Sequence, residues 1–136
     1  MKLTLCVALA AIVLGLCGEA RAQKLFTDIS NPAAMAEVMR AFDKCGLAEF
    51  LCPNANETMR NGIAALYYLY GVKQGFCGLT MGTGGSCQPL TAGQLEDIFL
   101  AFLDTHPGLT GFSTAEVAYV AWRDAGVIVP AVEGKK

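Results

Sequence analysis

Histidine is almost missing from this chain of 136 residues, in which His106 is the single copy. A zinc site is therefore not expected, because one histidine and widely spaced cysteines do not match the ligand spacing of such sites. Catalysis by a general base or a Cys-His pair would also depend on His106, which stands directly before Pro107 at the end of a predicted helix. A residue that can carry positive charge is favoured there by the helix dipole, so we expect a structural role for it.

Charged residues are also scarce, at 16% of the chain, and the basic ones do not cluster. From residue 23 onward there are eight Lys and Arg against eleven Asp and Glu, a formal net charge of −3. Binding to nucleic acid or to an anionic membrane surface is therefore not expected. Glu96, Asp97 and Asp104 fall on the side of their predicted helix away from its phenylalanines, which indicates a solvated face. Since no nucleophile, base and orienting group can be assembled, we expect no enzyme, and no metal or cofactor.

A hydrophobic run long enough to cross a membrane is lacking as well. Residues 3–16 form an apolar run of about 14 residues, whereas a transmembrane helix needs roughly 20. Lys2 precedes this run and Ala20-Arg21-Ala22 follows it as a small-x-small cleavage site, the pattern of a secretory signal peptide. We therefore expect residues 1–22 to be cleaved, and residues 23–136 to form one exported domain that does not enter a membrane.

A lipoprotein site at Cys17 is the alternative interpretation of this leader. Leu16 is bulky at a position where such sites have a small residue, so we favour the cleaved signal peptide.

The four cysteines that follow the leader indicate two disulfides, as an even number does in a short exported chain. Three connectivities are possible. We favour Cys77 with Cys87 and Cys45 with Cys52, because each pair is local and can close without a particular tertiary fold. Closing the loop between Cys77 and Cys87 is worth roughly 3 kcal/mol by chain entropy.

Helical signals dominate the rest of the chain and predict an all-α, disulfide-stabilised domain of four to five helices. Asn31-Pro32 predicts the start of a first helix over residues 33–44, ended by Gly46. Asn54 or Asn56 caps the next helix, whose end Gly71 and Gly75 mark. Its apolar face is predicted to hold Met59, Ile63, Leu66, Tyr67 and Tyr70.

Two capping boxes start the last two helices. Thr91 pairs with Gln94 in the first box, and Ser113 pairs with Glu116 in the second. The turn over residues 104–108 is predicted to set these helices antiparallel. Their buried stripes follow helical spacing and hold Leu95, Ile98, Phe99, Phe102 and Leu103 in one helix, and Val117, Val120 and Ala121 in the other.

The glycine-rich segment between Cys77 and Cys87 is the candidate binding element. It does not match a phosphate-binding loop, because Cys87-Gln88-Pro89 separates it from the next helix. A flexible, hairpin-like loop held at its base by a disulfide can enter a partner's cleft, since the crosslink lowers the ordering cost of binding. The predicted partner-binding residues in this loop are Thr80, Met81, Gly82, Thr83, Gly84, Gly85 and Ser86.

Tyrosines supply a second, weaker candidate for partner binding. Tyr67 and Tyr70 share the predicted apolar face and are expected to pack in the core. Tyr68 falls outside that face, so we expect it to be available for contact with a partner, as tyrosines often are at interfaces.

The order of several short motifs resembles the Rap/Tai immunity proteins. These motifs are Tyr68-Leu69-Tyr70-Gly71-Val72, a Gly-containing loop, Cys87-Gln88-Pro89, Thr91 with Gln94-Leu95, Thr105-His106-Pro107 and an Ala-rich last helix. The resemblance covers residues 63–125. It implies a small periplasmic helical protein, often a homodimer, that blocks the cleft of a peptidoglycan amidase delivered by type VI secretion and has no activity of its own. Ala65 stands where members commonly carry a cysteine, and residues 24–61 have no counterpart.

Two other classes of function stay open at this level. A small acid-protective chaperone would expose apolar surface at low pH, although few ionisable residues and one histidine limit such a switch. A helical carrier of an apolar ligand would enclose a sizeable cavity between its Phe- and Leu-bearing helices.

Overall fold

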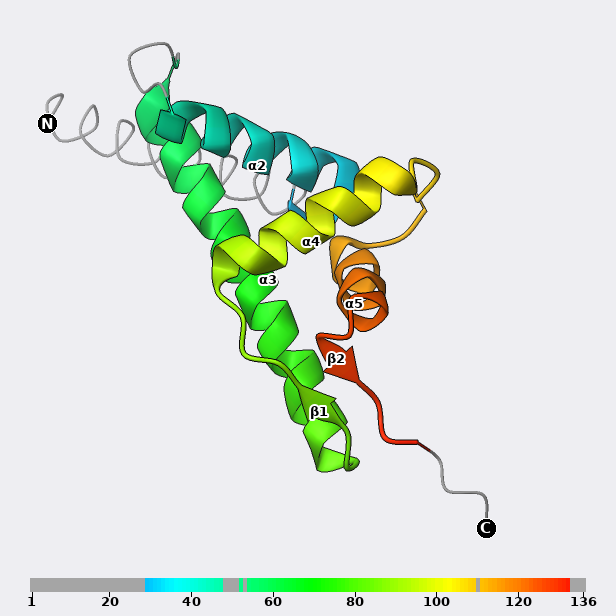
Figure 1. Cartoon of the computed structure of the whole chain (residues 1–136). Helices are drawn as coiled ribbons and strands as arrows, with labels where there is room; N and C mark the ends of the chain where they lie inside the picture. The colour runs from blue at the N-terminus through cyan, green and yellow to red at the C-terminus, as the bar shows by residue number, and fades with distance from the viewer. Residues whose placement is uncertain (1–28, 48–51, 53, 110, 133–136) are drawn as a thin grey trace, which may run out of the picture.

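The computed structural model describes residues 29–47, 52, 54–109 and 111–132, and this part of the chain is mostly helical (Figure 1). Its helices are α2 (Pro32–Leu47), α3 (Ala55–Gly82), α4 (Ala92–Thr105) and α5 (Thr114–Asp124). Two short strands, β1 (Ser86–Cys87) and β2 (Ile128–Val129), pair antiparallel, with Ser86 opposite Val129 and Cys87 opposite Ile128. The prediction of a small all-α domain is confirmed.

Local capping accounts for the starts of three helices. The side-chain oxygen of Asn31 accepts hydrogen bonds from the backbone N–H groups of Ala33 and Ala34, at 3.0 and 3.1 Å, directly before Pro32 begins α2. Both predicted capping boxes are present, at Thr91 before α4 and at Ser113 before α5. Each box satisfies N–H groups that a helix start leaves without an intrahelical partner.

Helix α3 is longer than its glycines predicted. Gly71 and Gly75 were expected to mark its end, yet the helix continues through both to Gly82. Asn54 precedes it with φ 59°, and its carbonyl accepts from the N–H groups of Glu57 and Thr58. Because α3 contacts α2, α4, α5 and both strands, packing over its length outweighs the low helix propensity of glycine.

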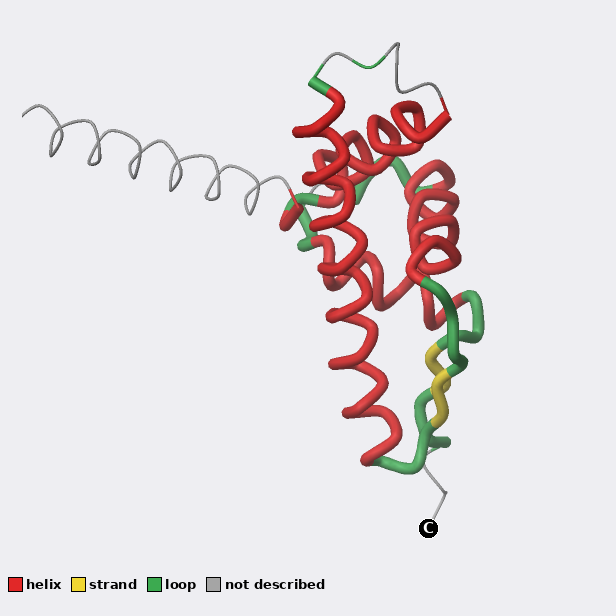
Figure 2. Tube along the Cα trace, turned by 90° about the vertical axis from the view of Figure 1, so that its left-hand side faces the viewer, coloured by secondary structure: helices red, strands yellow, loops and turns green. Residues whose placement is uncertain are grey.

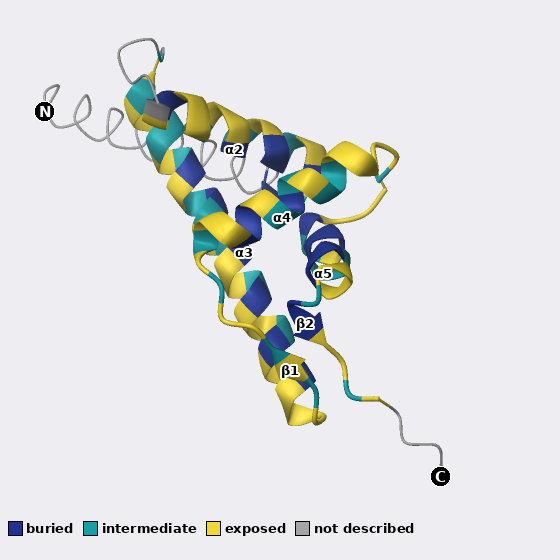
Figure 3. Cartoon of the chain, viewed as in Figure 1, coloured by how far each residue is buried: buried dark blue, intermediate teal, exposed yellow. Residues whose placement is uncertain are grey.

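The core lies where the four helices meet, and the buried residues in Figure 3 line this inner side. Trp122 of α5 is fully buried, and its indole N–H donates to the carbonyl of Leu95 in α4 at 3.2 Å. The largest fully buried side chains are those of Trp122, Phe99, Met35, Met39, Leu69, Leu95, Ile128 and Val117. The predicted buried stripes of α4 and α5 are confirmed, with Ile98, Phe102, Leu103 and Val120 only partly buried.

The relative direction of α4 and α5 differs from the prediction. Figure 1 shows α4 lying across the view and α5 close to end-on, so the two helices cross steeply and are not antiparallel. The connection after α4 runs from His106 to Ser113, which is longer than the tight turn expected at residues 104–108. This length lets α5 turn across α4 and place Trp122 against Leu95.

Both favoured disulfides are present. Cys77 bonds to Cys87 and joins α3 to β1, with a Cα–Cα distance of 5.6 Å. Cys45 bonds to Cys52 and joins the end of α2 to the segment before α3, with a Cα–Cα distance of 5.3 Å. Residues 48–51 and the leader lie outside the described residues.

Candidate functional site

The candidate loop is largely the end of a helix. Thr80, Met81 and Gly82 form the last turn of α3, a tight turn follows at residues 83–85, and Ser86 begins β1. The expected flexible excursion of residues 80–86 is therefore wrong, because α3 does not fray at its glycines. We call residues 79–86 the α3 tip. Figures 1 and 2 show that it projects beyond the other helices and that the two strands lie beside it.

A small network holds the turn in place. The carbonyl oxygen of Thr80 accepts from the backbone N–H groups of Thr83 and Gly85, at 3.2 and 2.9 Å, and from the Thr83 hydroxyl at 2.9 Å. Gly84 has φ +87°, a left-handed conformation that favours glycine. Gly85 lets the backbone of β2 approach, since a Cβ there would lie 2.5 Å from the carbonyl oxygen of Val129.

Exposure separates the predicted contact residues of the tip. The side chain of Thr80 is buried, so it stabilises the tip and cannot meet a partner. Gly85 is partly buried. The exposed members are Met81, Gly82, Thr83, Gly84 and Ser86. Leu79, which lay just outside the predicted segment, is 71% exposed and is the large apolar residue that sequence reasoning missed.

The structure reverses the predicted roles of the tyrosines. Tyr68 is partly buried and packs against the core, and this burial raises the pKa of its hydroxyl. Tyr67 is 74% exposed and Tyr70 is 41% exposed, so the expectation that they pack in the core is wrong. The buried face of α3 is made instead of Gly62, Ala65, Leu69, Lys73, Cys77 and Thr80.

Tyr67 and Tyr70 border an open pocket of about 470 Å³ beside the start of α4. Every residue around it is uncharged: Ile63, Leu66, Tyr67, Tyr70 and Ala92. We call this the tyrosine pocket.

A second apolar pocket, of about 330 Å³, opens between α3, the end of α4 and α5. Phe76 and Tyr119 pack against each other at its side, with ring centroids 4.6 Å apart. Phe102, Leu109, Phe112, Val117 and Val120 line the rest, and among the described residues around it Glu116 alone is charged. The carboxylate of Glu116 is held by Ser113, and these hydrogen bonds lower its pKa.

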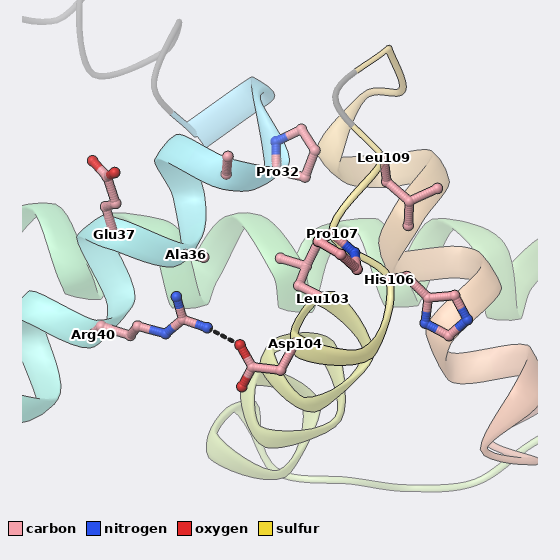
Figure 4. A pocket seen from close by; sticks show the side chains of 10 residues that line it. Pro32, Ala36, Glu37, Arg40, Leu103, Asp104, His106, Pro107 and Leu109 are labelled. Atoms are coloured by element: carbon pink, nitrogen blue, oxygen red, sulfur yellow. Dashed lines mark hydrogen bonds and ion pairs between the residues drawn. The ribbon is translucent and has the colours of Figure 1, made fainter.

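The third pocket lies between α2 and the end of α4 and contains the lone histidine (Figure 4). Arg40 and Asp104 form an ion pair across it, and their side chains are 47% and 65% exposed. His106 points away from this pair and stacks on Phe102 at 4.1 Å, with its Nδ1 2.9 Å from the Phe102 carbonyl. The ring thus interacts with a carbonyl of the last helical turn, which matches the structural role predicted for it.

Glu96 is a further residue that the sequence analysis placed wrongly. It is 5% exposed, not on a solvated face, and its Oε1 atom is buried with no hydrogen-bond partner among the described residues. Burial, together with the charges of Asp43 and Asp97, raises its pKa to about 7. The helical spacing from the phenylalanines failed here because α2 brings Asp43 close to a second side of α4.

The described residues hold no group of three or more metal-ligating His, Cys, Asp or Glu side chains. None of the helices described is long and apolar enough to span a membrane. The two disulfides point to an oxidising compartment. Comparisons of the chain with protein-family models, with curated proteins and with solved structures found no match.

Proposed function

We propose that this chain is a periplasmic immunity protein that binds and inhibits a peptidoglycan amidase delivered by type VI secretion, with no catalytic activity of its own. The observation that carries this proposal is the α3 tip, a narrow projecting element whose large apolar side chain, Leu79, is left uncovered. The amidase as partner comes from the motif order that resembles the Rap/Tai proteins.

Three constraints make the tip suitable for entering a cleft. The Cys77–Cys87 disulfide fixes its base, the β1–β2 pairing fixes one side, and the Thr80 carbonyl holds the turn. A tip that is ordered before it binds loses little conformational entropy on binding. The disulfides also fit the periplasm, where they form and persist.

The test measures inhibition of purified type VI peptidoglycan amidases by the disulfide-bonded chain, through the release of cleaved wall peptides. We expect one amidase to be inhibited and to be captured from a cell-envelope lysate. Leu79→Glu should weaken this inhibition at least about thirtyfold, as expected for loss of a buried apolar anchor.

Phe112→Glu is the matched control, because Phe112 is also large, apolar and exposed but lies on the α4–α5 connection. It should inhibit as well as the parent chain. The proposal is contradicted if Leu79→Glu and Phe112→Glu lose inhibition equally. It is also contradicted if neither the parent chain nor Phe112→Glu inhibits any amidase. Capture of many unfolded proteins at low pH, with no amidase among them, would instead favour the chaperone.

The apolar pocket beside Phe76 and Tyr119 supports a second candidate function, carriage of a small apolar ligand. Its volume of about 330 Å³ is within the range of ligand sites. Binding of a fluorescent apolar probe that Val120→Trp abolishes would support this function, and a probe signal unchanged in that variant would contradict it.

A further inference from the structure

Four aromatic rings, one each from α3, α4, the connection after α4 and α5, line the apolar pocket of about 330 Å³. In chain order they are Phe76, Phe102, Phe112 and Tyr119. The other described residues around the pocket are aliphatic, apart from Glu116. Aromatic pairs prefer offset or edge-to-face arrangements and gain more from them than from area burial alone. The lining therefore favours a ligand with an aromatic ring.

Contacts with neighbouring rings hold three of these four side chains in place. Phe76 packs on Tyr119 with ring centroids 4.6 Å apart. Phe102 stacks on His106, which lines the neighbouring pocket and not this one. Phe112 is 54% exposed, so it is the ring most open to solvent. Because most of the wall is ordered by its own contacts, little conformational entropy is lost when a ligand enters.

A carboxylate lies at the edge of this apolar space. Glu116 is exposed and is the one charged residue among the described residues that line the pocket. Glu116, Tyr119 and Val120 are three and four positions apart on α5, so their side chains share one side of the helix. The carboxylate therefore lies beside the aromatic wall and in contact with water.

The Glu116 carboxylate is ionised and keeps one oxygen for a ligand. Its Oε2 atom accepts hydrogen bonds from the backbone N–H and the hydroxyl of Ser113, each at 2.8 Å. These bonds lower the pKa of Glu116, so the side chain is negatively charged at neutral pH. Both bonds reach the same oxygen, so Oε1 remains available to a cationic group.

The one basic residue of α5 does not cancel this charge. The guanidinium carbon of Arg123 lies 6.0 Å from the ring centroid of Tyr119, and its Nη2 atom pairs with Asp124 at 3.3 Å. Arg123 does not line the pocket, and it is two helical turns from Glu116, about 10 Å along the axis. The charge at the edge of the pocket is therefore negative.

We infer that this pocket binds a small aromatic amine, with its ring among the four aromatic side chains and its ammonium group at Oε1 of Glu116. The inference rests on the second candidate function proposed above, carriage of an apolar ligand, and names the chemical class of that ligand. A neutral aromatic molecule fills the same space without a bond to the carboxylate, and an aromatic acid brings a second negative charge beside it. At the edge of the pocket the ammonium group stays in contact with water, so it avoids the large cost of burying a charge.

The experiment compares three probes that share one aromatic ring and differ in charge: phenethylamine, phenethyl alcohol and phenylacetate. NMR titration of the full chain, exported from a bacterial host with both disulfides formed, measures the three dissociation constants. Phenethylamine should bind about threefold to fivefold more tightly than phenethyl alcohol, because an exposed ion pair contributes modestly. Phenylacetate should bind more weakly than the alcohol. The backbone signals that shift should include those of Phe76 and Tyr119.

Glu116→Gln removes the charge and keeps the helix start, because glutamine serves equally at the third position of a capping box. Phenethylamine and phenethyl alcohol should bind this variant with equal affinity. Glu57→Gln is the matched control, since it makes the same change in the first turn of α3, outside the pocket lining. It should keep the preference of the parent chain for the amine.

The outcomes separate this inference from the functions proposed above. Equal affinity of the parent for amine and alcohol, tighter binding of phenylacetate, or an unchanged preference in Glu116→Gln would overturn the inference and leave carriage of an apolar ligand standing. Binding of none of the three probes would overturn both. The immunity proposal is tested separately, through Leu79 and the inhibition of an amidase.

Discussion

The inner and outer faces of α3 carry opposite kinds of residue. The inner face packs against the other helices through Gly62, Ala65 and Leu69, whereas the outer face exposes Ile63, Tyr67 and Tyr70. Small inner residues let α2 come so close that Phe42 fills the space over Gly62. Large outer residues add nothing to the core of a single chain. The comparison teaches that size alone does not mark the buried side of a helix, because close helix packing can prefer the smaller residues.

The largest expected difference between the two faces is in the cost of removing a side chain. Leu69→Ala, on the inner face, should lower the free energy of unfolding by about 2–5 kcal/mol, because it leaves a cavity in a fully buried site. Tyr67→Ala, on the outer face, should change the stability of the monomer by no more than about 0.5 kcal/mol. Urea unfolding of dilute protein measures both. Similar losses in the two variants would show that the faces have been assigned wrongly.

The Cys77–Cys87 disulfide connects the inner face of α3 to β1, so its removal tests how far the tip depends on that face. The double variant Cys77→Ser/Cys87→Ser should unfold with a free energy about 3 kcal/mol lower, from the chain entropy of the opened loop. Urea unfolding measures this change, with the parent as reference. The inhibition proposed for the tip should weaken in the same variant, while the Cys45→Ser/Cys52→Ser control should lose stability and keep inhibition per folded molecule. Equal inhibition by both double variants would mean that the disulfide does not position the tip.

Glu96 extends the comparison to the inner side of α4. Its pKa is about 7 in the folded chain against 4.5 for an ordinary glutamate, so between these values the folded chain holds a proton that the unfolded chain has released. Stability should therefore be greatest below pH 4.5 for this group, fall as pH rises, and level off above pH 7. Glu96→Gln removes this dependence and should be more stable than the parent by about 2 kcal/mol at pH 8, and nearly equal at pH 5.

Unfolding free energies at pH 5, 6, 7 and 8 measure the Glu96 effect. Asp43→Asn is a second test, because loss of that neighbouring charge should lower the pKa of Glu96 in the folded chain. The fall in stability should then be smaller and should end at a lower pH. Parallel pH profiles for the parent and Glu96→Gln would show that another group controls the dependence.

Features that depend on neighbouring residues in sequence were predicted well. The capping boxes at Thr91 and Ser113 involve residues three positions apart, and both disulfides close short loops.

Features that depend on packing between helices far apart in sequence were predicted poorly. The sequence analysis assigned the largest apolar residues of α3 to its buried face. In the structure Gly62 and Ala65 are buried instead, because α2 packs so closely that only small residues fit. Glu96 looked solvated by its spacing from Phe99 and Phe102, yet α2 brings Asp43 beside it. The exposure of Leu79 was missed for a related reason. Gly71 and Gly75 were expected to end α3, but the helix continues to Gly82 and includes Leu79.

The glycines of α3 give the smallest expected effects and the sharpest distinction between the faces. Gly62→Ala should lower the free energy of unfolding by about 1–2 kcal/mol, since its Cβ would overlap Phe42. Gly75→Ala has open space and should raise it by about 0.5–1 kcal/mol through helix propensity. Urea unfolding of the two variants, with the parent chain as reference, measures both changes.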